Sequence, residues 1–251
     1  MKAGIVGLPN VGKSTLFNCL TNGKAQSANF PFCTIDPNFG AVTIPDERLN
    51  KLVELVKPEK IIPNSVEIVD IAGLVKGASK GEGLGNQFLS NIRETNAIIH
   101  VLRCYENDNI THVEGSVDPY RDKEIIDFEL QIKDLETIKK RTDRIERQAK
   151  SGDKSFLKEF NVLDSVVESL NKGVSVRLQS ISVEDYKNYI KPLSLLTSKP
   201  VLYVCNINEN EISNQSSELT KLIKFLENEG SRVVVLAAKI EEEINELENY
   251  E

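Results

Sequence analysis

The sequence predicts an α/β fold with a mainly parallel sheet and an inserted antiparallel helical hairpin. Two observations support this prediction. Short apolar runs rich in β-branched residues alternate with helical stretches over most of the chain, which is typical of a parallel sheet covered by helices. Between residues 121 and 198 this alternation stops, and two amphipathic segments follow one another. A length of 251 residues suits one such domain with an insertion.

Six apolar runs are the predicted strands. They are almost entirely apolar, as is expected of strands that are buried on both faces. In chain order they cover residues 3–6, 41–44, 66–69, 97–102, 201–205 and 233–236. We therefore expect these six strands to form one sheet.

The predicted insertion is a pair of helices. Apolar residues at spacings near 3.5 mark the first helix, namely Phe128, Ile132, Leu135, Ile138, Ile145 and Ala149. A break at Gly152 and Asp153 follows, and the second helix places on one face Phe156, Phe160, Leu163, Val167 and Leu170. We predict a coiled-coil-like helical insertion over residues 121–198, within a domain made of residues 1–120 and 199–251.

Composition excludes several classes of protein. Hydrophobic residues make up 40% of the chain and charged residues 27%, which is typical of a globular protein and not of a disordered or fibrous one. No stretch approaches the roughly 20 apolar residues of a membrane helix, and the strand-like start of the chain leaves no room for a signal peptide. We expect a soluble, cytoplasmic monomer without a membrane partner.

Charge and cysteine usage exclude further classes. A net charge of −7 argues against a protein whose whole surface binds nucleic acid, and we expect no DNA partner. The four cysteines lie far apart, with no histidines at zinc spacing nearby: Cys19, Cys33, Cys104 and Cys205. Neither a disulfide framework nor a structural zinc site is expected.

The most specific motif is a glycine-rich loop between the first strand and the first helix. Residues 7–14 read G-L-P-N-V-G-K-S, which matches the G-x-x-x-x-G-K-S phosphate-binding loop in its expected strand-loop-helix setting. Backbone N–H groups of this loop can converge on phosphate oxygens, and the helix N-terminus adds positive potential. Lys13 can reach the β- and γ-phosphates, and the Ser14 hydroxyl can bind Mg²⁺. The sequence therefore predicts a nucleoside triphosphate site.

Two further segments fit the γ-phosphate and metal side of such a site. Asp70 ends an apolar strand in the sequence D-I-A-G, where enzymes with this loop place the carboxylate that holds Mg²⁺ through water, and the Gly73 amide can contact the γ-phosphate. Leu74 follows, and its apolar side chain cannot position the attacking water, so the water must be positioned by another group. Thr34, in the loop N-F-P-F-C-T, can complete the Mg²⁺ shell. On this interpretation the catalytic residues are Lys13, Thr34 and Gly73, and the metal-binding residues are Ser14, Thr34 and Asp70.

Base recognition is expected at the carboxyl ends of the last two strands, where ligands bind in this class of fold. These ends read Asn206-Ile207-Asn208-Glu209 and Ala237-Ala238-Lys239. Guanine-specific relatives carry N-K-x-D, whose aspartate accepts two hydrogen bonds from the base. Glu209 replaces that aspartate here and Ile207 replaces the lysine, which favours adenine, although GTP remains the alternative.

The histidines and a cluster of cations are weaker candidates. His100 lies within an apolar strand and is interpreted as a core residue, and His112 lies in a polar loop and is no better candidate for a catalyst. One face of the first long helix offers a possible RNA-binding stripe: Lys139, Lys140, Arg141, Arg144, Arg147 and Lys150. Interleaved acids favour an ordinary ion-paired surface instead.

Five ordered motifs together resemble one family. G-L-P-N-V-G-K-S, N-F-P-F-C-T-I-D-P-N, D-I-A-G-L-V-K-G-A-S-K-G-E-G-L-G-N, N-I-N-E and A-A-K-I-E are similar to those of the Obg-like ATPase (YchF) family of translation-factor-related P-loop NTPases. This resemblance implies a G-domain fold, Mg²⁺-dependent hydrolysis that favours ATP over GTP, and association with ribosomes or ribosomal RNA.

The resemblance also implies roles for particular residues. Phosphates are held by Asn10, Val11, Gly12, Lys13, Ser14 and Thr15, and the base by Asn206, Ile207, Glu209 and Ala238. In relatives without a water-positioning glutamine, an asparagine that matches Asn10 can bind K⁺ as an activator. Family members continue into a β-rich TGS domain, whereas this sequence stops at Glu251, which puts ribosome binding that depends on that domain in doubt.

We therefore predict a P-loop nucleoside triphosphatase that hydrolyses ATP to ADP and phosphate, slowly unless a partner or K⁺ assists. Two alternatives are a GTPase and a nucleotide-gated binding module whose hydrolysis is incidental.

Overall fold

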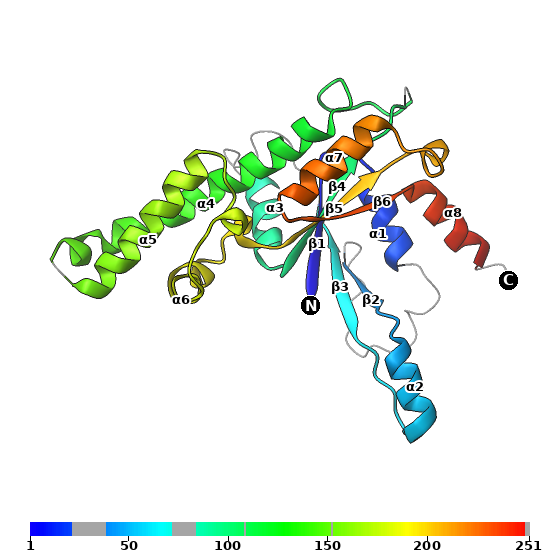
Figure 1. Cartoon of the computed structure of the whole chain (residues 1–251), viewed down its shortest axis with the longest axis horizontal. Coiled ribbons are helices and arrows are strands. Elements are labelled where there is room, and N and C mark those ends of the chain that lie inside the picture. The colour runs from blue at the N-terminus through cyan, green and yellow to red at the C-terminus, as the bar shows by residue number, and fades with distance from the viewer. Residues whose placement is uncertain (22–38, 72–83, 108, 152, 249–251) are drawn as a thin grey trace.

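A computed structural model describes residues 1–21, 39–71, 84–107, 109–151 and 153–248 (Figure 1). Within these ranges six strands form one sheet in the order β2-β3-β1-β4-β5-β6. Their bounds are Lys2–Val6 for β1, Phe39–Thr43 for β2, Ser65–Asp70 for β3, Ala97–Arg103 for β4, Val201–Asn206 for β5 and Arg232–Leu236 for β6. The α/β class and the six predicted strands are confirmed.

The sheet is parallel except at one edge. β2 pairs antiparallel with β3, and the other four pairings are parallel. β1 and β4 are mostly buried, as their continuous apolar sequences predict. The edge strands β2 and β6 are half-exposed, because each has a strand neighbour on one side only.

Helices surround the sheet and divide its core in two. One apolar cluster joins the central strands to α1 (Lys13–Thr21) and α3 (Leu84–Arg93), and a second joins β5 to α7 (Ser217–Asn228). α8 (Ala238–Glu248) lies beside α1, while α2 (Glu47–Val56) projects from the sheet and buries none of its residues (Figure 1). α1 and α8 follow the carboxyl ends of β1 and β6, so both helices begin at the same edge of the sheet.

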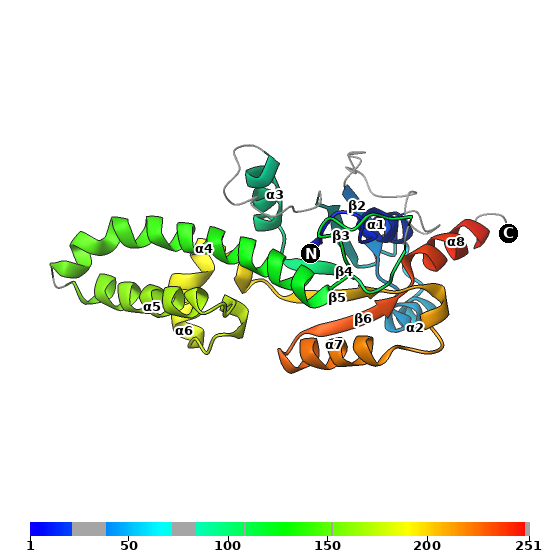
Figure 2. The same ribbon diagram turned by 90° about the horizontal axis from the view of Figure 1, so that it is seen from above.

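The predicted helical hairpin is present between β4 and β5. α4 (Pro119–Lys150) and α5 (Lys154–Asn171) run side by side and extend away from the sheet (Figure 2). They form a third apolar cluster, in which Ile138 and Ile145 of α4 contact α5. The prediction was wrong for Phe128, which is 60% exposed. The first half of α4 faces the sheet through Ile126 and Leu130 instead, so the buried face changes along the helix.

Short helices connect the hairpin to β5. Their bounds are Val176–Leu178, Val183–Asp185 (α6), Tyr186–Ile190, Lys191–Leu193 and Leu196–Ser198, and another one-turn helix, Glu209–Glu211, follows β5. Asp134 of α4 is fully buried and accepts hydrogen bonds from the backbone N–H groups of Leu196 and Thr197 at 2.7 and 2.8 Å. This carboxylate fixes α4 to the segment that leads into β5.

The division of the chain into residues 1–120 with 199–251 and an insertion of residues 121–198 stays a prediction. Across the residues described, we find no helix with the length and apolar character needed to cross a membrane.

Candidate nucleotide-binding site

The glycine-rich loop connects β1 to α1, as the motif predicts. Asn10 has a left-handed backbone with φ of 63°, a conformation that asparagine tolerates better than most residues. Gly12 has φ of 96°, and a Cβ atom there would collide with the side-chain amide of Asn206. Glycine is therefore required at position 12 for both conformation and close approach.

Lys13 begins α1 and is nearly buried. Its Nζ donates a hydrogen bond to the Leu8 carbonyl at 2.7 Å, which holds the ammonium group across the loop. Burial lowers the pKa of Lys13 to about 8, and the nearby Asp70 carboxylate opposes this shift. The amine is therefore a desolvated donor without a strong anionic partner, which suits the binding of a phosphate.

Ser14 and Asp70 come together at the start of α1. The Ser14 hydroxyl donates to Asp70 Oδ2 at 3.1 Å, while Asp70 Oδ1 is buried and has no hydrogen-bond partner among the described residues. A buried carboxylate oxygen without a partner beside a hydroxyl fits the oxygen-ligand chemistry of Mg²⁺. In the part of the chain that is described, no group of three or more His, Cys, Asp or Glu residues could hold a metal, and Mg²⁺ bound with a nucleotide needs only one or two protein ligands.

Asn206 joins the phosphate loop to the end of β6. Its side-chain Nδ2 donates to the Val11 carbonyl at 3.0 Å, and its Oδ1 accepts from the Ala238 N–H at 3.0 Å. The residue is buried and each of its polar side-chain atoms makes one of these bonds. Asn206 thereby positions these two backbones, while its amide retains one N–H donor and one oxygen lone pair, so its predicted contact with the base stays a prediction.

A cavity of about 560 Å³ opens next to this connection, at the carboxyl ends of β5 and β6. Among the predicted residues, its lining includes Gly12, Thr15, Asn206, Ile207, Glu209 and Ala238. Ile207 is buried and Glu209 is exposed at the start of its one-turn helix. Lys239, Glu242 and Glu243 of α8 also line the cavity, so its edge carries several carboxylates. Two predicted phosphate contacts, Gly12 and Thr15, thus share this cavity with the four predicted base contacts.

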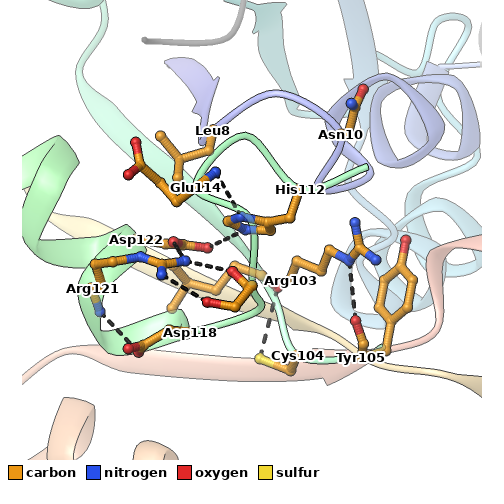
Figure 3. Close-up of polar contacts among 12 residues, drawn as sticks. Leu8, Asn10, Arg103, Cys104, Tyr105, His112, Glu114, Asp118, Arg121 and Asp122 are labelled. Atoms are coloured by element: carbon orange, nitrogen blue, oxygen red, sulfur yellow. Dashed lines mark hydrogen bonds and ion pairs between the residues drawn. The ribbon is translucent and has the colours of Figure 1, made fainter. Parts of the chain in front are cut away.

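The segment after β4 forms another wall of this cavity, through Tyr105, Asn107 and Ile110. Arg103, the last residue of β4, is 1% exposed and donates hydrogen bonds to the carbonyls of these three residues. Figure 3 shows its guanidinium beside the Tyr105 ring, and the guanidinium carbon is 4.8 Å from the ring centroid. The same segment reaches the phosphate loop, because Asn10 Nδ2 donates to the Thr111 carbonyl at 3.1 Å.

His112 ties this segment to the start of α4 (Figure 3). Its Nδ1 accepts from the Glu114 N–H, so Nε2 is the atom that donates to Asp122 Oδ2, at 2.8 Å. Both side chains are buried, and Asp122 also accepts from Arg121 at 3.1 Å. The interpretation of His112 as a residue of a polar loop missed this buried pair.

Comparison with known proteins agrees with this geometry. Residues 2–140 match the family described as 50S ribosome-binding GTPase. The ribosome-binding ATPase YchF of Bacillus subtilis (strain 168) is 52% identical over 253 residues, a match that covers 100% of this chain and 69% of that protein. The chain belongs to the YchF family. The protein of the same name from Escherichia coli O157:H7 is 52% identical over 250 residues, covering 100% of this chain and 68% of that protein.

A solved YchF structure has the same fold. The Schizosaccharomyces pombe YchF GTPase aligns with a TM-score of 0.84 at 37% sequence identity, over 98% of this chain and 68% of that one. The resemblance inferred from the five motifs and the G-domain fold are thereby confirmed. These YchF proteins are named for different nucleotides: the two bacterial relatives are called ATPases and the S. pombe protein is called a GTPase.

Two predicted site residues of this YchF-family chain, Thr34 and Gly73, lie outside the described residues. Of the remaining candidates, His100 is a core residue as predicted: burial lowers its pKa to about 4, so the ring is neutral at pH 7. On α4, Arg141 pairs with Glu159 at 2.6 Å and Lys150 with Glu146 at 2.6 Å. These pairs favour the ion-paired interpretation of that surface.

Motif reasoning missed Arg103, Tyr105 and Asn107. One signal was present in the sequence: Arg103 directly follows six apolar or buried strand positions, where an arginine is rare unless its donors are satisfied.

Proposed function

We propose that this YchF-family protein hydrolyses ATP to ADP and phosphate with Mg²⁺ and prefers ATP to GTP. One observation supports this most directly: buried Lys13 and the Ser14–Asp70 pair lie at the loop and helix start whose Gly12 and Thr15 line the cavity at Ile207 and Glu209. Such an arrangement can take the phosphates, the metal and the base of a single nucleotide. The family assignment makes the protein a nucleoside triphosphatase.

At the phosphate end, the chain supplies charge and donors. The loop N–H groups and Lys13 can stabilise the negative charge that spreads over the γ-phosphoryl group in the transition state. Ser14 and Asp70 would hold Mg²⁺, which supplies further neutralisation of the phosphate charge when bound. We also propose Thr34 as a metal ligand and the Gly73 amide as a γ-phosphate contact.

At the base end, the acidic edge of the cavity supports adenine. Position 6 of the purine carries an amino donor in adenine and a carbonyl acceptor in guanine. Glu209, Glu242 and Glu243 can accept hydrogen bonds and would repel a carbonyl oxygen, which favours the amino group. Ile207 offers an apolar surface for the purine ring in place of a lysine stem.

Parallel calorimetric titrations with ATP and GTP, with and without Mg²⁺, test this proposal. We expect the dissociation constant for ATP to be lower, and a tenfold preference for GTP would reverse the base assignment. The double variant Ile207→Lys, Glu209→Asp restores the residues of guanine-specific relatives and should shift the ratio toward GTP by about tenfold. Glu227→Asp, an exposed change on α7, is the matched control and should leave the ratio unchanged.

A monovalent cation is a further part of the proposal. Asn10 uses Nδ2 in its bond to Thr111, so Oδ1 is the atom that could bind K⁺ beside the phosphates. Turnover should then fall when K⁺ is replaced by Na⁺. Equal turnover in the two salts would exclude this role for Asn10.

The proposed partner is the ribosome, because the bacterial relatives are named ribosome-binding ATPases and the matched family is described as ribosome-binding. We further propose that the protein is a cytoplasmic monomer without a membrane or DNA partner. Cosedimentation with ribosomes in the presence of ATP or ADP tests this partner. Reversing the charges of Arg141, Arg144 and Arg147 should weaken cosedimentation if the stripe contacts ribosomal RNA, and unchanged binding would identify the stripe as solvated surface.

A nucleotide-gated binding module remains the second candidate function. The direct contact between the cavity wall and the phosphate loop, through Asn10 and Thr111, gives nucleotide binding a route to the α4 region. If ribosome binding depends on the bound nucleotide but is the same for ATP and a non-hydrolysable analogue, hydrolysis is incidental to it.

A further inference from the structure

Arg103 is buried at the end of β4 and has no carboxylate partner in the part of the chain that the structure describes. Its polar contacts within the described residues are three backbone carbonyls. Nε donates to Tyr105 O at 3.1 Å, Nη1 to Ile110 O at 3.0 Å and Nη2 to Asn107 O at 3.2 Å. Burying a guanidinium without an opposite charge is costly, so these carbonyls must stabilise it strongly.

The carbonyls that accept from Arg103 belong to Tyr105, Asn107 and Ile110. These same three residues of the segment after β4 line the cavity proposed for the base. The guanidinium also lies against the Tyr105 ring, with its carbon 4.8 Å from the ring centroid. It therefore fixes both the backbone of the wall and the aromatic ring on it. A lysine could not do the same, because one ammonium group lacks the planar fork that reaches three separated acceptors.

Arg103 has a counterpart on the neighbouring strand. It pairs in register with Asn206 of β5, which fixes the phosphate loop and the start of α8. Arg103 thus holds the cavity wall after β4, and Asn206 holds the wall formed by the phosphate loop and the start of α8. Among the described residues, the side-chain hydrogen bonds of Arg103 all go to the wall after β4. That wall meets the phosphate loop through the single bond from Asn10 to Thr111, whereas Asn206 bonds the loop directly. Removing the contacts of Arg103 should therefore affect the base more than the triphosphate.

We propose that Arg103 is a positioning residue for the base: its guanidinium shapes the Tyr105–Ile110 wall and thereby determines the part of ATP affinity that comes from adenine. Arg103 itself does not touch the nucleotide. The inference rests on the proposed function in one respect, that the cavity at Ile207 receives the base.

The test compares ATP with inorganic triphosphate, which lacks the base, by calorimetry in Mg²⁺ on the full chain. Arg103→Lys should raise the dissociation constant for ATP about tenfold, the effect of a weakened base-stacking contact. Its dissociation constant for triphosphate should not change. The matched control is Arg177→Lys, because Arg177 is also buried but lies at the opposite ends of the strands, where it pairs with Asp127 at 3.0 Å. This control should leave both constants unchanged.

A second variant covers the case in which Arg103→Lys does not fold. Tyr105→Leu keeps the arginine, removes only the half-buried ring, and should reproduce the selective loss of ATP affinity. Equal weakening of ATP and triphosphate by Arg103→Lys would show a general structural role and overturn the proposal. So would unchanged ATP affinity in folded Arg103→Lys or in Tyr105→Leu.

The wild-type titration separates this inference from the proposed function. If the wild-type protein binds GTP more tightly than ATP, the adenine assignment fails. The effect of Arg103 is then measured with GTP against triphosphate in the same way.

Discussion

Arg103 and Asn206 are register partners at the carboxyl ends of β4 and β5, and each uses its buried polar atoms to hold loop backbone. Asn206 connects the phosphate loop to α8, and Arg103 holds the segment after β4. The base cavity lies among the three backbones that they fix. The ends of β4 and β5 thus support the phosphate loop and the segment after β4, which surround the cavity.

The connection made by Asn206 predicts a defect in both stability and phosphate binding. Asn206→Ala leaves the Val11 carbonyl and the Ala238 N–H without their side-chain partner. We expect the free energy of unfolding to fall by about 2 kcal/mol, measured by urea denaturation. Affinity should fall for ATP and inorganic triphosphate alike, because the phosphate loop itself is released.

The matched control for this prediction is Asn228→Ala at the end of α7. Asn228 is exposed and does not line the cavity. It should change neither stability nor affinity measurably. If the two variants behave alike, the connection through Asn206 does not hold the site together.

The lowered pKa of Lys13 predicts that ATP binding takes up protons. The pKa of about 8 in the free protein should rise when phosphates surround the amine, since anions favour its charged form. At pH 8 about half a proton should then be bound per nucleotide, and affinity should fall as the pH rises from 7 to 9. Calorimetry at pH 8 in two buffers with different ionisation enthalpies measures this uptake. Identical heats in both buffers would mean that Lys13 does not titrate on binding.

Much of this fold could be predicted because strong local patterns specify it. The strands β1 and β4 are continuous apolar runs that can be satisfied only in the interior of a sheet. The glycine-rich loop was equally clear, since few backbones other than a phosphate-binding turn require glycine at position 12 together with a lysine beside it. In such segments the local sequence and the tertiary environment agree.

The segment after β4 could not be predicted because its order comes from long-range contacts. Arg103 holds carbonyl groups, and every residue type has a carbonyl, so the sequence does not reveal which ones it contacts. His112 similarly depends on Asp122 of another element. Phe128 was assigned to the buried face because a single helical period was assumed, but α4 contacts the sheet with one face and α5 with another. These three cases share one cause, a partner that the local pattern does not contain.

The partnerless oxygen of Asp70 predicts a selective loss of metal-dependent activity. Asp70→Asn keeps the size of the side chain and removes its charge, so Mg²⁺-supported hydrolysis should fall about 10- to 100-fold. Nucleotide affinity measured in EDTA should stay near the wild-type value, because no metal then contributes. Phosphate release assays across a Mg²⁺ titration, with Glu67→Gln on the same strand as the exposed control, provide the measurement. Unchanged Mg²⁺ dependence would remove Asp70 from the metal site.

The carboxylate of Asp134 predicts a defect of stability alone. Asp134 is fully buried on α4, and its oxygens accept from Leu196 N–H, Thr197 N–H and the Thr197 hydroxyl at 2.7 to 2.8 Å. Asp134→Ala leaves two buried N–H groups without an acceptor, so the free energy of unfolding should fall by about 3 kcal/mol. Asp143→Ala, an exposed change on the same helix, should have almost no effect. The proposed nucleotide contacts lie at the opposite ends of the strands. A folded Asp134→Ala protein should therefore bind ATP with wild-type affinity. Weakened binding would instead show that the anchoring of α4 to β5 supports the nucleotide site.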